Sequence, residues 1–167
     1  PFFVNALMRK IRGVLGDSGK YRIRKGQSML YIEPEEGFDM DQATKQLRRV
    51  FGVLLFHRAL EVEKELESIK VHSGEYFAKA LNQSRSFKIE TRRTDKQFPQ
   101  RSQEINNVLG QYIANTFPHL KVDVHHPDVT IYVNIRKDGA YLYHDKEKGA
   151  GGLPVGTGGK ATALLSG

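Results

Sequence analysis

The 167-residue chain contains no cysteine and no tryptophan. The absence of cysteine excludes a disulfide framework, a zinc or iron–sulfur centre held by cysteine, and a thiol nucleophile among these residues. The sequence also lacks an apolar run of the ~18 to 20 residues needed to cross a bilayer, and its first residues lack the pattern of a secretory signal. We therefore expect a cytoplasmic protein that does not contact a membrane.

Acidic side chains are the minority among the charged residues, with 19 Asp and Glu against 26 Lys and Arg and a formal charge of +7. A chain with 39% hydrophobic and 27% charged residues is typical of folded globular proteins, and its length fits one domain or two small ones. The positive excess favours an anionic partner such as nucleic acid, although a basic protein without such a partner has the same composition. The positions of the charges are therefore more informative than their sum.

The first sixty residues predict the element order helix, strand, strand, helix, strand. Apolar residues recur at helical spacing over 2–15 and again after Asp39, with two short alternating segments between them that predict a hairpin. The near-continuous apolar start of the segment 53–62 predicts a strand buried on both faces. This order matches a ferredoxin-like unit without its first strand, so we expect a truncated ferredoxin-like domain over residues 1–60.

The second half predicts a mixed domain over residues 61–147, which makes the fold class α+β. A helical pattern begins near Glu63, a clean alternation of strand type occupies 86–92, and a second helical pattern occupies 102–117. The alternating runs of VTIYVNIRKDGAYLYH predict a hairpin in which Asp138-Gly139 supplies the positive-φ turn. These elements alternate as expected for an α/β arrangement.

Glycine is concentrated in GAGGLPVGTGGK, and we expect residues 148–167 to form a linker that ends at the start of a strand. A Walker loop requires serine or threonine after its lysine, whereas Lys160 is followed by Ala161. An enzyme that binds a phosphate substrate in this stretch remains an alternative.

Elsewhere, His125 and His126 point to opposite faces of an extended chain and offer too few ligands for a metal, so we expect no metal site. We also expect no catalytic residue in this chain.

The strongest local charge lies between Arg85 and Arg101, where six basic residues stand against two acidic ones. The segment predicts a strand, a loop and a helix start, and the free N–H groups of a helix N-terminus favour phosphate. Phe98 has a ring suited to stacking on a base; the alternative is a solvated loop that Phe98 anchors in the core. A second basic set occupies the first helix and hairpin, and two patches suit an extended polyanion. This second set consists of Arg9, Lys10, Arg12, Lys20, Arg22, Arg24 and Lys25.

Three strings resemble the tRNA 4-thiouridine synthetases, also called tRNA sulfurtransferases, over essentially the whole chain. They are FKIETRRTDKQFPQRSQEINNVLGQYI, HHPDVTIYVNIRKDGAYLYHDKEKGAGGLPVGTGGK and the terminal ATALLSG. The resemblance implies a ferredoxin-like domain followed by a THUMP domain. The family's catalytic domain opens with an S-G-G-x-D-S loop, of which Ser166 and Gly167 match the first two residues. We therefore expect a chain that lacks the ATP-binding domain, binds no cofactor and is inactive alone.

The same resemblance implies that the intact protein uses ATP and Mg²⁺ to convert the uridine at position eight of tRNA to 4-thiouridine, with sulfur from a cysteine desulfurase. In many members it also serves thiamine synthesis. The two domains would hold the acceptor stem and the 3′ CCA end of tRNA. A THUMP-bearing part of a tRNA methyltransferase or deaminase is the alternative, and GAGGLPVG running into ATALLSG argues against it. The sequence leaves open whether the chain forms a homodimer.

The residues expected to bind RNA come from the two basic patches. The basic loop supplies Arg92, Arg93, Lys96 and Arg101, with Phe98 beside them; the hairpin supplies Arg136 and Lys137; and the further candidates are Lys88, Arg9, Arg12 and Arg24.

Overall fold

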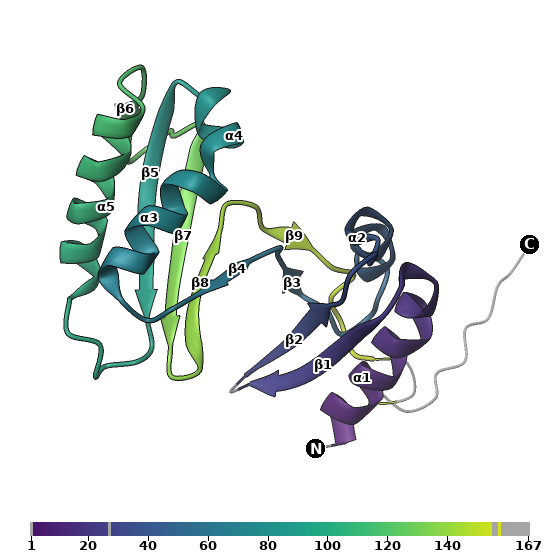
Figure 1. Cartoon of the computed structure of the whole chain (residues 1–167). Helices are drawn as coiled ribbons and strands as arrows, with labels where there is room; N and C mark the ends of the chain where they lie inside the picture. The colour runs from purple at the N-terminus through teal and green to yellow at the C-terminus, as the bar shows by residue number, and fades with distance from the viewer. Residues whose placement is uncertain (1, 27, 155–156, 158–167) are drawn as a thin grey trace, which may run out of the picture. The chain divides into compact units, whose positions relative to one another are not determined.

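The computed structural model describes residues 2–26, 28–154 and 157, which belong to two compact units (Figure 1). The first unit combines the chain up to Phe56 with the segment that starts at Lys146, and the second runs from His57 to Asp145. Both units contain helices and strands, as expected for the α+β class. The chain therefore leaves the first unit once and returns to it.

The first unit packs two helices and a hairpin around a small apolar core. Helices α1 (Phe2–Leu15) and α2 (Met40–Leu47) contact each other, and the unit also contains the hairpin of β1 (Tyr21–Gly26) and β2 (Met29–Pro34) and a short 3₁₀ turn η1 (Gly16–Ser18) after α1. Asp39 caps α2, because its Oδ1 accepts hydrogen bonds from the backbone N–H groups of Asp41 and Gln42 at 3.0 and 2.9 Å. The apolar core cluster consists of the buried residues Leu7, Ile11, Leu15, Ala43, Leu47, Val50 and Val53.

The apolar segment 53–62 does not form the single buried strand that its composition predicts. It holds β3 (Leu55–Phe56) in the first unit and β4 (Leu60–Val62) in the second. Leu54 is 72% exposed, so the run is not buried on both faces. The prediction was wrong because this segment is where the chain passes from one unit to the other.

The first half of the glycine-rich stretch is packed structure in the first unit. Strand β9 (Glu147–Lys148) pairs antiparallel with β3, and the backbone N–H groups of Gly149 and Gly151 donate to Leu54 O and Val53 O at 3.0 and 2.8 Å (Figure 1). A side chain at Gly149 would collide with the backbone of Val53, so only glycine permits this approach. Residues 155, 156 and 158–167, including the expected ATP-loop residues Ser166 and Gly167, lie outside the described part of the chain.

The second unit is a sheet with helices packed on one face. The strand order is β4-β8-β7-β5-β6, with β5 parallel to β6 and β7 and the other pairs antiparallel. Alternate residues of β7 join the helices in one core, whereas Thr130, Tyr132 and Asn134 face the other side of the sheet. The elements are α3 (Leu66–Tyr76), α4 (Ala78–Asn82), β5 (Ser86–Arg93), α5 (Ser102–Thr116), β6 (Lys121–Val122), β7 (Val129–Arg136) and β8 (Gly139–Tyr143).

The predicted hairpin of β7 and β8 is confirmed, but its turn differs from the expectation. Arg136 pairs with Gly139, so Lys137 and Asp138 form the turn. Neither Asp138 nor Gly139 has the positive φ predicted for this turn. A Cβ at Gly139 would lie 2.9 Å from Oε1 of Glu61, the far end of a flexible side chain that can move aside.

Candidate nucleic-acid interface

The basic loop, residues 94–101, connects the carboxyl end of β5 to α5 in the second unit. The backbone N–H groups of Thr94 and Asp95 donate to Ile135 O at 2.9 and 3.2 Å. Ile135 lies next to the last residue of β7, so these two hydrogen bonds place the start of the loop beside the hairpin turn. The expected loop and hairpin residues therefore share one corner of the sheet.

One ion pair ties the loop to two other segments. Asp95 is 4% exposed, and its Oδ2 accepts from Nζ of Lys64 at 2.6 Å while its Oδ1 accepts from the backbone N–H of Gln97 at 3.0 Å. The same Nζ donates to Lys137 O at 3.2 Å. Hydrogen bonds from Lys64 and Gln97 hold the pKa of Asp95 below its usual value. The carboxylate thus joins the loop, the approach to α3 and the hairpin turn.

Arg93 and Phe98 are turned into the loop rather than toward solvent. Nη1 of Arg93 donates to Phe98 O at 2.7 Å and to Gln100 O at 3.1 Å. Phe98 is 5% exposed and belongs to the apolar core of the unit. These positions correct two expectations, because Phe98 has no exposed face for a base and the half-buried Arg93 holds the loop instead of facing a partner. The core-anchor alternative for Phe98 is the one that the structure supports.

A carboxylate, that of Glu104, already lies at the start of α5, where phosphate was expected to bind. The backbone N–H of Arg101 donates to a carboxylate oxygen of Glu104 at 2.5 Å. This contact satisfies a donor and places a negative charge at the positive end of the helix dipole. The negative charge of Glu104 opposes a phosphate at this helix start, so the basic side chains are the better candidates for anion binding at this corner.

The cations that face outward form a set that we call the outer cations. Nζ of Lys96 donates to Arg93 O at 3.1 Å, which keeps this side chain over the loop. Two nearby candidates are less open: half-buried Arg136 lies 3.8 Å from Asp138, and half-buried Lys88 lies 3.4 Å from Glu90. The outer cations are the exposed residues Arg92, Lys96, Arg101 and Lys137.

The expected cations of the first unit are arranged differently. Arg9 and Arg12 are exposed on α1. Arg24 on β1 is engaged within the hairpin, with its Nε 2.6 Å from Oε1 of Glu33 and its guanidinium 4.2 Å from the centre of the Tyr31 ring. The exposed helix cations are therefore more open to an anion than Arg24.

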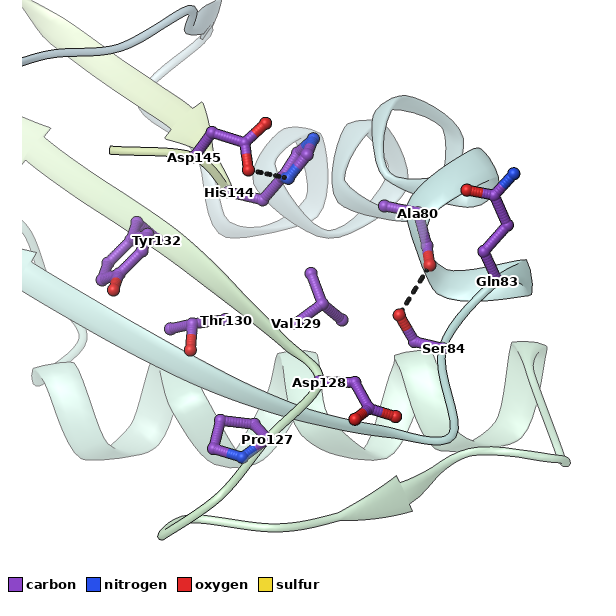
Figure 2. A pocket seen from close by; sticks show the side chains of 10 residues that line it. All are labelled: Ala80, Gln83, Ser84, Pro127, Asp128, Val129, Thr130, Tyr132, His144 and Asp145. Atoms are coloured by element: carbon purple, nitrogen blue, oxygen red, sulfur yellow. Dashed lines mark hydrogen bonds and ion pairs between the residues drawn. The ribbon is translucent and has the colours of Figure 1, made fainter. Parts of the chain in front are cut away.

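A polar cavity of about 380 Å³ lies at the amino end of β7 (Figure 2). Its lining includes the carboxylates of Asp128 and Asp145 and no lysine or arginine. Oδ2 of Asp128 accepts from the backbone N–H groups of Arg85 and Ser86 at 2.8 and 3.3 Å. Phosphate is repelled by such a lining, and the basic loop lies at the opposite end of the parallel strands. The lining residues are Ala80, Gln83, Ser84, Pro127, Asp128, Val129, Thr130, Tyr132, His144 and Asp145.

The described residues hold no group of three His, Asp or Glu side chains arranged for a metal ion. Oδ1 of Asp123 accepts from the backbone N–H groups of His125 and His126, each at 2.9 Å, so this cluster is a local turn.

The longest described helix, α5, has 15 residues, and no helix among residues 2–26 and 28–154 combines the length and apolar character of a bilayer span.

Comparison with known proteins assigns both units to families. Residues 63–145 match the model of the THUMP domain, and residues 1–56 match that of the ThiI ferredoxin-like domain. A probable tRNA sulfurtransferase of Acetivibrio thermocellus is 39% identical over 170 residues, covering 100% of this chain and 43% of the relative. The chain belongs to the tRNA sulfurtransferase family. It spans less than half the length of this relative, and it covers 41% of a second one, from Limosilactobacillus reuteri, at 39% identity.

A solved structure of the tRNA sulfurtransferase family matches the whole fold. It is a crystal structure of a 4-thiouridine synthetase–RNA complex with bound ATP, with a TM-score of 0.83 and 32% identity, covering 99% of this chain and 42% of the other. The expected ferredoxin-like and THUMP architecture is thereby confirmed. The basic loop and the outer cations lie within the THUMP match.

Proposed function

We propose that this chain is the tRNA-binding portion of a tRNA sulfurtransferase that makes 4-thiouridine at position eight of tRNA. The observation that carries the proposal is the likeness to the 4-thiouridine synthetase–RNA complex over 99% of this chain. The outer cations supply the matching chemistry, because they are exposed and gather at one corner of the THUMP unit. In this proposal they contact the phosphates of the acceptor stem and the 3′ CCA end.

The geometry explains how such a surface selects RNA by shape. An RNA duplex presents regular phosphates and little readable sequence, so recognition depends on the spacing of cations more than on base contacts. Arg92 projects from the end of a strand and Arg101 from the start of a helix, so each is anchored to regular structure at its backbone. Fixed cations favour one register of phosphates over others. Arg9 and Arg12 on α1 provide the second patch for the same RNA.

The sulfur chemistry of the intact protein belongs to the length that this chain does not cover. We propose that ATP and Mg²⁺ serve there to activate the uridine, and that a cysteine desulfurase supplies sulfur in the cytoplasm. The chain itself contains no cysteine to carry sulfur. Its own residues bind and orient tRNA, so that the target uridine is presented to the catalytic domain.

Filter binding with an acceptor-stem minihelix tests the proposal on this chain. The double change Arg92→Ala and Arg101→Ala should weaken binding about tenfold or more and lower the salt slope by about 1.4 to 1.8, since each lost phosphate contact removes ~0.7 to 0.9. Lys79→Ala on α4 is the matched control, because Lys79 is exposed in the same unit and is not one of the outer cations. Unchanged affinity and slope in the double variant would reject the assignment.

A second pair of probes separates the stem from the 3′ end. Minihelices with and without the single-stranded CCA should differ in affinity, with the truncated form weaker, because unpaired bases add contacts that a duplex end lacks. Equal affinity for both would refute 3′-end recognition while leaving stem binding intact.

A further inference from the structure

We propose that the Lys64–Asp95 ion pair is a positioning element of the RNA interface, which sets the basic loop so that the outer cations project outward. The inference rests on the proposed function, because positioning matters only if those cations bind RNA. Neither Lys64 nor Asp95 contacts RNA in this proposal. They act through the loop.

The contacts of Asp95 support this role. Its carboxylate is nearly buried, and both oxygens are used, one by Nζ of Lys64 at 2.6 Å and one by the backbone N–H of Gln97 at 3.0 Å. A charge is rarely placed in such surroundings unless it is paired, and an ion pair with full hydrogen bonding restricts geometry. Asp95 therefore sets the path of the chain into the first half of the loop.

The contacts of Lys64 extend the effect to the hairpin. Its Nζ also donates to Lys137 O at 3.2 Å, so one ammonium group joins the loop to the backbone of an outer cation. The ion pair thus joins the backbone at Lys137 to the loop that carries Lys96 and Arg101, although the two segments are separated in sequence. Loss of the pair would release both segments together.

Arg93 completes the frame on the other side of the loop. Its guanidinium binds Phe98 O and Gln100 O, and Lys96 donates to the carbonyl of Arg93 itself. These contacts give hydrogen-bond donors to carbonyl oxygens that would otherwise repel phosphate. A loop ordered in this way before binding loses less conformational freedom when RNA arrives.

The direction in which Asp95→Asn changes RNA affinity distinguishes a positioning role from a simple charge effect. Asp95→Asn removes a negative charge close to the outer cations, and Coulomb attraction alone predicts tighter RNA binding with a steeper salt dependence. Positioning predicts the reverse, because the substituted amide would keep the contact to Gln97 and lose the ion pair that fixes the loop. The two accounts therefore disagree in direction and not merely in size.

The decisive experiment compares Asp95→Asn with Glu90→Gln by filter binding of the acceptor-stem minihelix at several salt concentrations. Glu90 is exposed on β5 of the same unit and lies 3.4 Å from Lys88, so Glu90→Gln removes the same charge without touching the loop. We expect Asp95→Asn to weaken binding about tenfold and to lower the salt slope, and Glu90→Gln to strengthen binding about twofold. Equal or tighter binding by Asp95→Asn overturns the positioning role.

A second series protects the test against a folding defect. Lys64→Met should weaken binding to a similar extent, Lys64→Arg should restore it by keeping the ion pair, and the double change Lys64→Met with Asp95→Asn should be no weaker than the weaker single variant. In Lys64→Met, the backbone amide of Gln97 should exchange hydrogen faster than in the unchanged chain, whereas the amides of β7 should exchange at the same rate. Equal affinities of Lys64→Met and Lys64→Arg would contradict the proposal.

Failure of the two proposals gives different results. If Arg92→Ala with Arg101→Ala weakens binding and Asp95→Asn does not, the cations bind RNA and the ion pair does not position them. If the arginine pair has no effect, the proposed function of the corner fails regardless of the Asp95 result.

Discussion

Each of the two units contains an irregular segment, and different interactions hold the two segments in place. In the first unit, the segment 147–154 is paired by the backbone groups of Gly149 and Gly151. In the second, the basic loop is held mainly by charged side chains, through the Lys64–Asp95 pair and Arg93. Backbone pairing depends on space, whereas ion pairing depends on charge. An added atom should therefore damage the first segment, and a lost charge the second.

The difference suits what each segment exposes. Backbone pairing of 147–154 uses the polar main-chain groups within the unit and leaves little for a ligand. In the basic loop, inward-facing charges satisfy the carbonyls and leave a second set of cations directed outward. A surface that binds an anion benefits from the arrangement in the basic loop, because it leaves cations exposed. Two kinds of change test this comparison. An added atom should disrupt the segment 147–154 but not the basic loop, and a lost charge should disrupt the basic loop but not the segment 147–154.

The largest effect is expected from Gly149→Ala. The added Cβ would enter the backbone of Val53, so the pairing of β9 with β3 has to open. We expect the first unit to lose about 3 kcal/mol of stability, comparable to an overpacked core site. Differential scanning calorimetry at two salt concentrations measures this loss, which should not depend on salt. A variant with native stability would show that the close approach is not required.

Gly13→Ala is the matched control in the same unit. Gly13 lies in α1, and a Cβ there would meet no atom within 4 Å. Alanine in a helix is favoured over glycine by ~0.5 to 1 kcal/mol, so this variant should be slightly stabilised. Destabilisation by both changes would mean that the first unit tolerates no added methyl group, and the backbone argument for Gly149 would lose its support.

Acid should release the basic loop while leaving the glycine segment paired. Because Lys64 and Gln97 hold the pKa of Asp95 below its ordinary 3.8, the folded chain keeps the carboxylate charged where an unfolded chain protonates it. The stabilisation is complete above about pH 4 to 5 and is lost as the pH falls through the lower folded pKa. Hydrogen exchange at Gln97, corrected for intrinsic rates, should show constant protection from pH 7 to about pH 4 and loss below it.

The Gly149 amide provides the comparison in the same exchange experiment. It donates to a backbone carbonyl, and neither group titrates in this range. Its protection should therefore persist where that of Gln97 is lost. Parallel loss at both amides would indicate that acid unfolds the whole chain, and protection of Gln97 that does not begin to fall below about pH 3.8 would contradict the role of the charged carboxylate.

Local periodicity predicted most elements of the fold, because helices and hairpins are decided by neighbouring residues. The helix at the start and the hairpin of β7 and β8 follow from residue spacing and turn residues. The break at Phe56 and the pairing of Leu55 with Lys148 do not, since they join distant parts of the chain. An apolar run indicates burial but does not tell which unit provides it.

The sequence indicated which segment holds the candidate site but did not distinguish the roles of its basic residues. Charge density pointed to the loop, yet it gave Arg92 and Arg93 the same role, although Arg92 is exposed and Arg93 holds carbonyls. Lys64 was missed because it lies in a run of glutamates that is typical of a solvated surface. Its partner Asp95 is 31 residues away, and no local pattern joins them. Only the packed structure distinguishes a charge that holds the loop from one that faces outward.

The smallest effect is expected from Arg48→Ala, which removes a charged contact of the glycine segment. Arg48 lies 2.7 Å from Oε2 of Glu147, with 51% of its side chain exposed. Exposed ion pairs contribute roughly 0 to 1 kcal/mol, and here the backbone pairing of β3 and β9 remains after the change. Calorimetry should therefore show a loss of about 0.5 kcal/mol or less, which shrinks further in high salt. A loss as large as that of Gly149→Ala would mean that charge holds this segment too, and the contrast between the two units would no longer stand.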